Sequence, residues 1–223
     1  MNSTLGFIVD NHQKVFHLTW EHIWIVGLAL AIAILIGVPL GILITKREDL
    51  SKPVLNTANV LMTIPSIALF GLMLPILAVW NLGLGKVPAI IALVLYSQLP
   101  IIRNTYTAIK NVPPEIVDAG KGMGMNRWEL LVEVEIPISI PVILAGLRTA
   151  AVMNIGIAAI ASYIGAGGLG VFIQQGINRV YPEMILSGAI LVSVLAIFVD
   201  GGMAILERIL TPKGIKIQRG LAG

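Results

Sequence analysis

The chain contains long apolar stretches without a charged side chain, and these stretches limit what it can fold into. Residues 23–44 include no Asp, Glu, Lys or Arg, and a helix needs about 20 such residues to cross the hydrocarbon core of a bilayer. Hydrophobic residues make up 57% of the chain and charged residues 12%, against about 25% charged residues in soluble proteins. We therefore predict an all-α integral membrane protein that forms a single domain over residues 1–223.

Four further apolar stretches follow, so five transmembrane helices are expected. The predicted spans cover residues 23–44, 55–79, 87–109, 138–164 and 184–206. Pro65 and Pro75 interrupt the second span, and a proline in a span leaves backbone groups that only neighbouring protein or water can satisfy. This span either lines a pathway or gate, with Pro65 and Ser66 as candidate residues, or is an ordinary kinked packing helix.

The basic residues are divided unequally between the two sides of the predicted spans. One side carries Lys46, Arg47, Lys52, Lys110, Lys121, Arg127, Arg208, Lys213, Lys216 and Arg219. The other side carries Lys14, Lys86 and Arg179. Cytoplasmic loops are enriched in Lys and Arg, so we expect the N-terminus outside, the C-terminus in the cytoplasm, and the long loop of residues 110–137 in the cytoplasm.

A first short helix is predicted at the start of this loop. Asn111 is a candidate N-cap, and Pro113 fits a first helical turn, where a missing N–H costs nothing. Glu115 adds negative charge near the positive end of the helix dipole. Three glycines then occupy every second position, namely Gly120, Gly122 and Gly124. Because glycine is unfavourable inside a helix, the helix is predicted to break there.

A second short helix is predicted after the break. Asn126 and Glu129 have the spacing of a capping box, and Pro137 is predicted to end the helix because proline removes an N–H and clashes with the preceding turn. Trp128 and Val134 belong to an apolar arc of this helix. We interpret the loop as the part of the chain that contacts another protein; the alternative is a solvated loop with an interfacial helix.

The spacing of residues in this loop resembles that in the permease subunits of ATP-binding-cassette importers. In that family a cytoplasmic loop carries Glu-Ala-Ala, then Gly after three residues, then Ile-x-Leu-Pro after nine more. This chain carries Asp118-Ala119-Gly120, Gly124 and Val134-Glu135-Ile136-Pro137 at the same offsets. The resemblance implies that the loop is a coupling helix seated in a groove of a cytoplasmic ATPase. The residues implicated in coupling are Glu115, Asp118, Ala119, Gly120, Gly124, Val134, Ile136 and Pro137.

Other segments resemble the permeases of osmoprotectant importers: Arg103-Asn104-Thr105-Tyr106, Ala145-Gly146-Leu147-Arg148-Thr149-Ala150, and the stretch from Ile164 to Gly170. The resemblance implies a five-span type I importer permease in a bacterial plasma membrane. Its implied partners are a second copy or a sister permease, ATPases inside and a substrate-binding protein outside. The implied substrates are glycine betaine, carnitine, choline or similar quaternary ammonium solutes, with a methionine or other amino-acid permease as the alternative. ATP and Mg would be bound by the partner ATPase, so this chain is expected to be non-catalytic and to hold no cofactor.

Several motifs typical of catalysis and binding are absent from the sequence or lack the structural context that they need. The stretch from Gly165 to Gly170 fits G-x-G-x-x-G, but it follows a predicted span instead of a β-strand, so it is interpreted as a bend where helices pack closely. The sequence has no P-loop and no cysteine. His12, His17 and His22 are spaced by five, which does not place them on one helix face, so no metal site is expected and they are assigned to the outer interface.

Nucleic acid is not expected as a partner, because no basic patch is interleaved with aromatic residues. Two other classes of membrane protein compete with an importer permease. A secondary transporter would carry repeats and paired ionisable residues near the midplane, and a membrane-embedded enzyme would carry a nucleophile with a base or a set of metal ligands. The sequence shows neither pattern.

A few polar side chains lie within the predicted spans, where each needs a partner or a function. Arg103, Arg148 and Asp200 lie at similar depth, so one arginine is predicted to pair with Asp200 while the other snorkels to the surface. Asn154 lies deeper and either lines the solute path or bonds a neighbouring helix. The outer segment adds further candidates for the path or its gate, namely Gly165, Gly167, Gly168 and Gly170.

Overall fold

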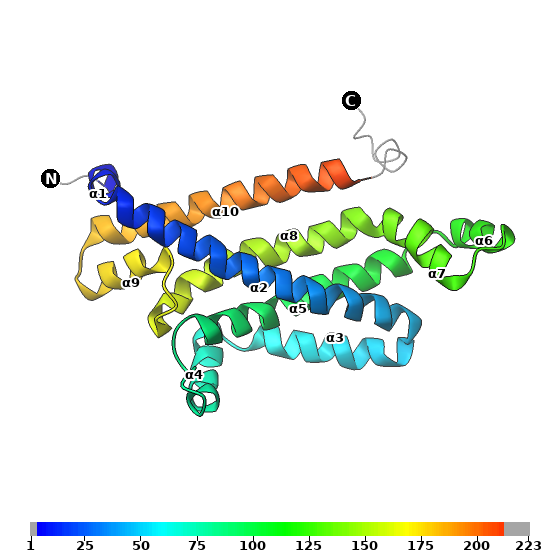
Figure 1. The fold of residues 1–223 in the computed structure, drawn as a ribbon, viewed down its shortest axis with the longest axis horizontal. Helices are drawn as coiled ribbons and strands as arrows, with labels where there is room; N and C mark the ends of the chain where they lie inside the picture. The colour runs from blue at the N-terminus through cyan, green and yellow to red at the C-terminus, as the bar shows by residue number, and fades with distance from the viewer. Residues whose placement is uncertain (1–3, 212–223) are drawn as a thin grey trace.

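The protein, in a computed structural model that describes residues 4–211, is built from helices, and no β-strand occurs among these residues. In chain order the helices are α1 (Thr4–Asp10), α2 (His12–Lys46), α3 (Glu48–Thr63), α4 (Ser66–Ala78), α5 (Lys86–Lys110), α6 (Pro114–Gly122), α7 (Arg127–Glu129), the π-helical η1 (Leu130–Glu135), α8 (Ile136–Ile160), the 3-10 helix η2 (Ala161–Ile164), α9 (Gly170–Asn178) and α10 (Pro182–Leu210). Figure 1 shows that the long helices form an elongated bundle.

Four continuous helical stretches are long and apolar enough to cross a membrane: α2, α5, the run from Arg127 to Ile164, and α10. The pair α3 and α4 meets the same criteria when its two helices are taken together. The expected third and fifth spans lie within α5 and α10, and the expected fourth span is covered by α8 together with η2. The helix that holds the expected first span, α2, already begins at His12.

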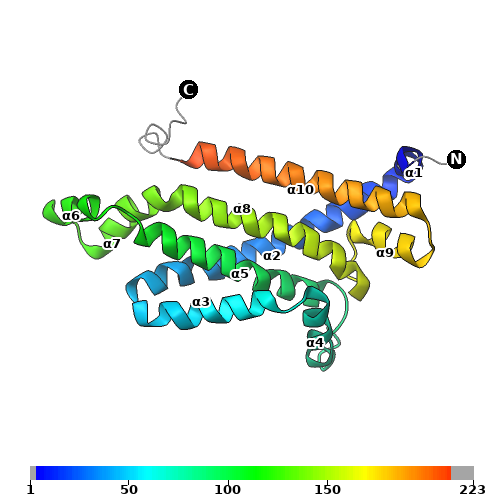
Figure 2. The ribbon, with the colours of Figure 1, turned by 180° about the vertical axis from the view of Figure 1, so that it is seen from behind.

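The centre of the bundle is the contact of α2 with α5 and α8. Ala29 and Ala33 of α2 are fully buried there, among apolar side chains from both other helices. A Cβ added at Gly41 would lie 2.6 Å from Thr105 Cβ, so α2 and α5 approach too closely for a larger residue. Helices in membranes commonly associate through small residues of this kind. In the view from behind, α5 and α8 run side by side in front of α2 (Figure 2).

The expected second span is bent sharply where α3 and α4 meet. The two helices form an angle of 99° at Ile64 and Pro65, whereas Pro75 lies inside α4 without breaking it. The hydroxyl of Tyr96 on α5 donates a hydrogen bond to the carbonyl oxygen of Ile64. This bond satisfies a backbone acceptor at the bend, as a membrane environment requires. Figures 1 and 2 both show α4 turned away from the line of α3.

The prediction that the second loop helix stops before Pro137 is wrong. The helix passes through Pro137 and continues as α8. The preceding turns are π-helical, and Ile136 N–H donates to Leu131 O, five residues back. Proline is tolerated here because it occupies the first turn of the α-helical segment, where its missing N–H and its ring disturb the hydrogen-bond pattern least.

Candidate functional site

The loop between α5 and α8 projects from one end of the bundle, beyond the ends of its neighbours (Figure 1). Its first helix, α6, begins after Pro113, which is the N-cap. The prediction that Asn111 is this N-cap is wrong: α5 extends to Lys110, and Asn111 is its C-cap. The two consecutive prolines start α6 instead, because their fixed φ suits a first helical turn.

Gly124 reverses the chain after α6. Met125 N–H donates to Gly120 O at 3.1 Å, and Gly124 N–H donates to Lys121 O at 2.9 Å. With Met123 as the C-cap, these bonds form a Schellman motif whose left-handed residue is Gly124, at φ +85°. A Cβ at Gly124 would have no neighbour within 4 Å. Glycine is therefore required here for its backbone conformation, and the space around it is open.

The second half of the loop packs against the first. Asn126 Oδ1 accepts from Trp128 N–H and Glu129 N–H, and Glu129 Oε2 accepts from Asn126 N–H at 2.7 Å. The predicted capping box is therefore present. A Cβ at Gly120 would lie 2.6 Å from Leu130 Cδ1, so Gly120 allows α6 to rest on the start of η1. The two short helices form one compact unit.

The surface of this unit carries exposed apolar side chains among charged ones. Met123 is 76% exposed and Trp128 is 67% exposed, and Ile116 and Val132 are also exposed. Among the residues implicated in coupling, Glu115, Asp118, Ala119 and Gly124 are exposed, Gly120 is buried, and Val134, Ile136 and Pro137 are half-buried in η1 and α8. Exposed apolar groups of this kind occur on surfaces that contact another protein or a membrane.

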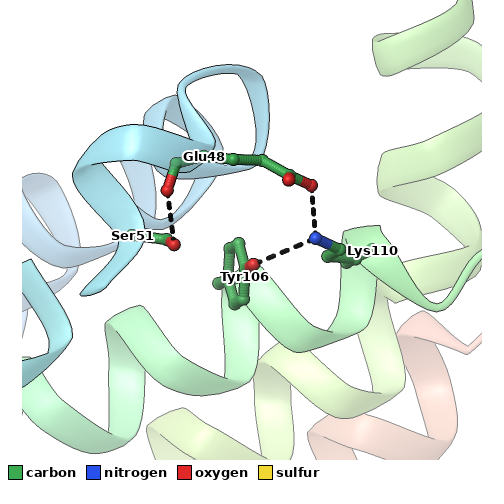
Figure 3. A network of polar contacts seen from close by, with 4 residues as sticks. All are labelled: Glu48, Ser51, Tyr106 and Lys110. Atoms are coloured by element: carbon green, nitrogen blue, oxygen red, sulfur yellow. Dashed lines mark hydrogen bonds and ion pairs between the residues drawn. The ribbon is translucent and has the colours of Figure 1, made fainter.

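Polar contacts connect the base of the loop to the turn between α2 and α3 (Figure 3). Lys110 forms an ion pair with Glu48, and its Nζ lies 3.3 Å from the hydroxyl of Tyr106. Ser51 Oγ donates to Glu48 O at 2.7 Å. No signal in the sequence identifies this network, because its members lie on α3 and α5, which only the fold brings together. It fixes the end of α5 against α3 just before α6 begins.

A second contact connects α2 to the loop. Lys46 Nζ lies 5.8 Å from the centroid of the Trp128 ring, a distance at which a cation is attracted to an aromatic face. Asp118, by contrast, contacts only its own helix, through an ion pair of 3.0 Å with Lys121. Both charges of that pair are largely exposed.

Within the spans, Arg148 is the arginine that contacts Asp200. Its guanidinium donates from both Nε and Nη2 to the two carboxylate oxygens, which joins α8 to α10. Arg103 forms no ion pair within residues 4–211. Asn154 is fully buried, and its Nδ2 donates to Ser97 Oγ at 2.8 Å. Asn154 therefore bonds a neighbouring helix, which is one of the two alternatives considered for it.

The glycine-rich segment after η2 is held by two side chains of α2. Gly168 N–H donates to Glu21 Oε2 at 2.9 Å, and Leu169 N–H donates to His22 Nδ1 at 3.2 Å. Since Nδ1 accepts, the ring proton lies on Nε2, which donates to Ile155 O at 3.1 Å. His22 is fully buried, so its assignment to the solvated interface is wrong. A buried imidazole with both ring nitrogens hydrogen-bonded has a structural role, and here it holds the glycine-rich segment and α8 against α2.

Glu21 also forms an ion pair of 2.7 Å with Lys86 at the start of α5. A Cβ at Gly168 would lie 2.8 Å from His22 Nδ1, at φ +73°, and Gly167 and Gly165 also have positive φ. A Cβ at Gly170 would lie 2.0 Å from Ala159 O. The expected close packing of this segment is therefore present.

At the other candidate gate, Pro65 is the exposed N-cap of α4 and Ser66 is half-buried as its first residue.

The contact between Arg148 and Asp200 predicts a specific pattern of stability changes. Asp200→Ala should lower the midpoint of thermal unfolding in detergent, because it leaves the guanidinium of Arg148 without its acceptor. Adding Arg148→Ala should restore part of the loss. Arg103→Ala is the matched control: its effect should simply add to that of Asp200→Ala. If the losses of stability are additive in both double variants, with Arg148→Ala as well as with Arg103→Ala, a pairwise contact between Arg148 and Asp200 is contradicted.

The sequence matches the family described as "Binding-protein-dependent transport system inner membrane component" over residues 33–211. It is 49% identical to the osmoprotectant import permease protein OsmW of Salmonella typhimurium, over 96% of this chain and 99% of that protein. It is 44% identical to the glycine betaine/carnitine/choline transport system permease protein OpuCB of Bacillus subtilis, over 97% of each chain.

Solved structures with a similar fold come from ABC transporters. A chain of the MetNI methionine ABC transporter superposes with a TM-score of 0.81 at 21% identity, covering 91% of this chain and 99% of that one. A chain of an amino acid ABC transporter solved with histidines gives 0.75 at 19% identity, covering 90% and 96%. The all-helical importer-permease fold expected from the sequence is confirmed. The chain belongs to the family of inner-membrane components of binding-protein-dependent transport systems.

Proposed function

We propose that this protein is the permease subunit of an ATP-binding-cassette importer that carries compatible solutes with a quaternary ammonium group. Glycine betaine, carnitine and choline are the candidate substrates, because relatives that are 38–49% identical over most of the chain are named for these solutes or for osmoprotectants. The methionine and amino-acid transporters are 19–21% identical in the structural comparison. A likeness at that level concerns the fold, so the osmoprotectant class is favoured.

The projecting α6–α7 unit is the observation that carries the proposed mechanism. Its exposed apolar side chains include Met123 and Trp128, and its position at one end of the bundle suits a protein bound outside the membrane. We assign this surface to a separate ATPase subunit, which would bind ATP and Mg and perform hydrolysis. A second copy or sister permease would complete the pathway, and a substrate-binding protein would deliver the solute to the opposite end.

The orientation of the chain follows from its basic residues. Lys46, Lys110 and Arg208 lie at helix ends on the same side as α6, whereas Lys86 starts α5 at the opposite side. The N-terminus is therefore assigned to the outside and α6 to the cytoplasm of a bacterial cell. Of the basic residues counted for this assignment, Lys213, Lys216 and Arg219 lie outside the described residues.

Thiol labelling of intact cells tests this orientation. Cysteines introduced singly at Lys86 and Arg179 should react with a membrane-impermeant reagent from outside. Cysteines at Lys52 and Arg127 should react only after permeabilisation, and a cysteine at Lys216 should behave like them. Labelling of Arg127→Cys in intact cells would place the α6–α7 unit on the wrong side for an ATPase.

Reconstitution tests the assigned activity. The permease, purified with its ATPase and supplied with its binding protein in proteoliposomes, should take up radiolabelled glycine betaine only when ATP is present on the ATPase side. A tenfold excess of unlabelled methionine should not reduce this uptake, whereas unlabelled carnitine should. Inhibition by methionine alone would assign the protein to the amino-acid importers instead.

A further inference from the structure

Arg103 is a cation in the middle of a membrane helix without an acidic partner among the described residues. It lies on α5, seven residues before Lys110, which corresponds to about 10 Å from the end of the helix at 1.5 Å per residue. The Arg103 side chain is nevertheless exposed. An ionised residue at such a depth normally faces a water-filled path or another protein group.

The exposed side of α5 is the side that faces away from α2. Ile101 and Thr105 contact α2, close to Gly37 and Gly41. Arg103 follows Ile101 by two residues, which turns it to the opposite side of the helix, and Thr107 lies one turn further on the same side. Thr107 is exposed as well. Arg103 and Thr107 therefore present polar groups on a face that no helix within residues 4–211 covers.

The neighbouring helix α8 continues this face. Ala145, Thr149 and Gly156 are its exposed residues, and they lie opposite Leu147, which is buried in the cluster around α2. These side chains are small or polar. The exposed residues of α10 include small ones such as Ser193 and Gly201, but large apolar side chains are exposed there as well, with Ile197 at 71% and Phe198 at 74%, as expected for a surface in contact with lipid. By contrast, α5 and α8 expose no large apolar side chain.

The outer end of the same face is closed by α4. Tyr96 lies two helical turns before Arg103 on α5, and with Ala89 and Ala92 it is buried beneath Leu69, Phe70 and Met73 of α4. The bend at Pro65 carries α4 across the bundle at this level. The face is thus covered in its outer half and uncovered in its inner half, where Arg103, Thr107 and Thr149 lie.

We propose that Arg103 binds the carboxylate group of a zwitterionic solute in the cytoplasmic half of the pathway, on a wall formed by α5 and α8. This inference rests on the proposed function and narrows its substrate class. A guanidinium can donate two parallel hydrogen bonds to a carboxylate. It repels a quaternary ammonium group, which has no hydrogen to donate. Arg103 therefore favours solutes such as glycine betaine and carnitine over choline, which lacks a carboxylate.

The reactivity of introduced cysteines tests whether the wall formed by α5 and α8 is in contact with water, whichever solute is carried. In inside-out vesicles Thr149→Cys should react with a charged, water-soluble thiol reagent at least tenfold faster than Phe198→Cys, the control at comparable depth on α10. Thr107→Cys should react faster with an anionic reagent than with a cationic one, and Arg103→Gln should remove that preference. If Thr149→Cys is as unreactive as Phe198→Cys, lipid or a second permease covers the face and the proposal is overturned.

Transport by charge variants tests the role of Arg103. With insertion and ATPase copurification unchanged, Arg103→Gln should reduce the maximal rate of glycine betaine uptake roughly tenfold or more, the range expected for a lost charged hydrogen bond. Arg103→Lys should retain most of the rate, and the ratio of choline to glycine betaine uptake should rise in Arg103→Gln. Wild-type uptake by Arg103→Gln would refute the assignment. A failure of the reconstituted wild type to carry either solute would instead concern the proposed function, and the accessibility result would still stand.

Discussion

Replacing Gly124 by valine should abolish solute uptake while leaving the membrane helices inserted. Gly124 has φ +85° and is the left-handed residue that ends α6. A residue with a Cβ costs about 1–2 kcal/mol in this conformation, and a β-branched residue costs more. The turn that orients α6 relative to α7 would then be lost, and with it the surface assigned to the ATPase. We expect ATPase copurification and solute-stimulated hydrolysis to fall at least roughly tenfold, since about 1.4 kcal/mol corresponds to a factor of ten.

Two further variants make this experiment specific to backbone conformation. Gly122→Ala is the matched control, because a Cβ there meets nothing within 4 Å and its φ is not positive; it should leave uptake intact. Gly124→Asn should recover much of the activity, since asparagine tolerates the left-handed region better than other residues. Normal uptake by Gly124→Val would mean that the α6–α7 unit is a solvated loop without a coupling role.

Replacing His22 by alanine should strongly destabilise the end of the bundle opposite α6. The substitution leaves Leu169 N–H without its acceptor, removes the second bond to Ile155 O, and opens a cavity where a fully buried ring was. Losing a partner of a buried polar group costs about 1–3 kcal/mol, and large-to-small changes in a core add to this. The midpoint of thermal unfolding in detergent should therefore fall markedly, and the glycine-rich segment should become susceptible to protease.

His17 provides the control for this variant. It lies on the same helix but is exposed, so His17→Ala should change stability by less than about 0.5 kcal/mol. His22→Phe separates the two contributions, since it fills the cavity but cannot form either hydrogen bond. We expect it to be less stable than the wild type and more stable than His22→Ala. Wild-type stability in His22→Ala would show that the two hydrogen bonds do not hold the segment.

The positions of the membrane helices could be predicted from the sequence because the determining signal is local. A span needs a sufficient length of apolar residues, and residues 87–109, 138–164 and 184–206 meet that condition without reference to any other part of the chain. The capping box of Asn126 and the break near Gly124 are also local, since their hydrogen bonds join residues at most five positions apart. The fixed spacing of residues in the loop, on which the resemblance to importer permeases rests, is local in the same sense.

Local rules were not sufficient to place the helix breaks at prolines. Pro137 was expected to end a helix, but the π-helical turns before it place it in the first turn of α8, where its missing N–H is tolerated. Pro65 and Pro75 were equivalent in the sequence, and only Pro65 marks a bend, where Tyr96 accommodates the free carbonyl. Proline indicates where a helix can change direction, and the packing around it decides whether it does.

The sequence by itself determined the class of the protein, its helices and the form of the loop of residues 110–137, because these depend on hydrophobic length, charge and short-range hydrogen bonds. Only the tertiary structure decided that Asp200 pairs with Arg148 and leaves Arg103 without an ion pair within residues 4–211, that Lys110 contacts Glu48, and that His22 is buried beneath the glycine-rich segment. These contacts join residues between 52 and 147 positions apart. No periodicity or spacing encodes such pairings, since they arise only when whole helices pack against one another.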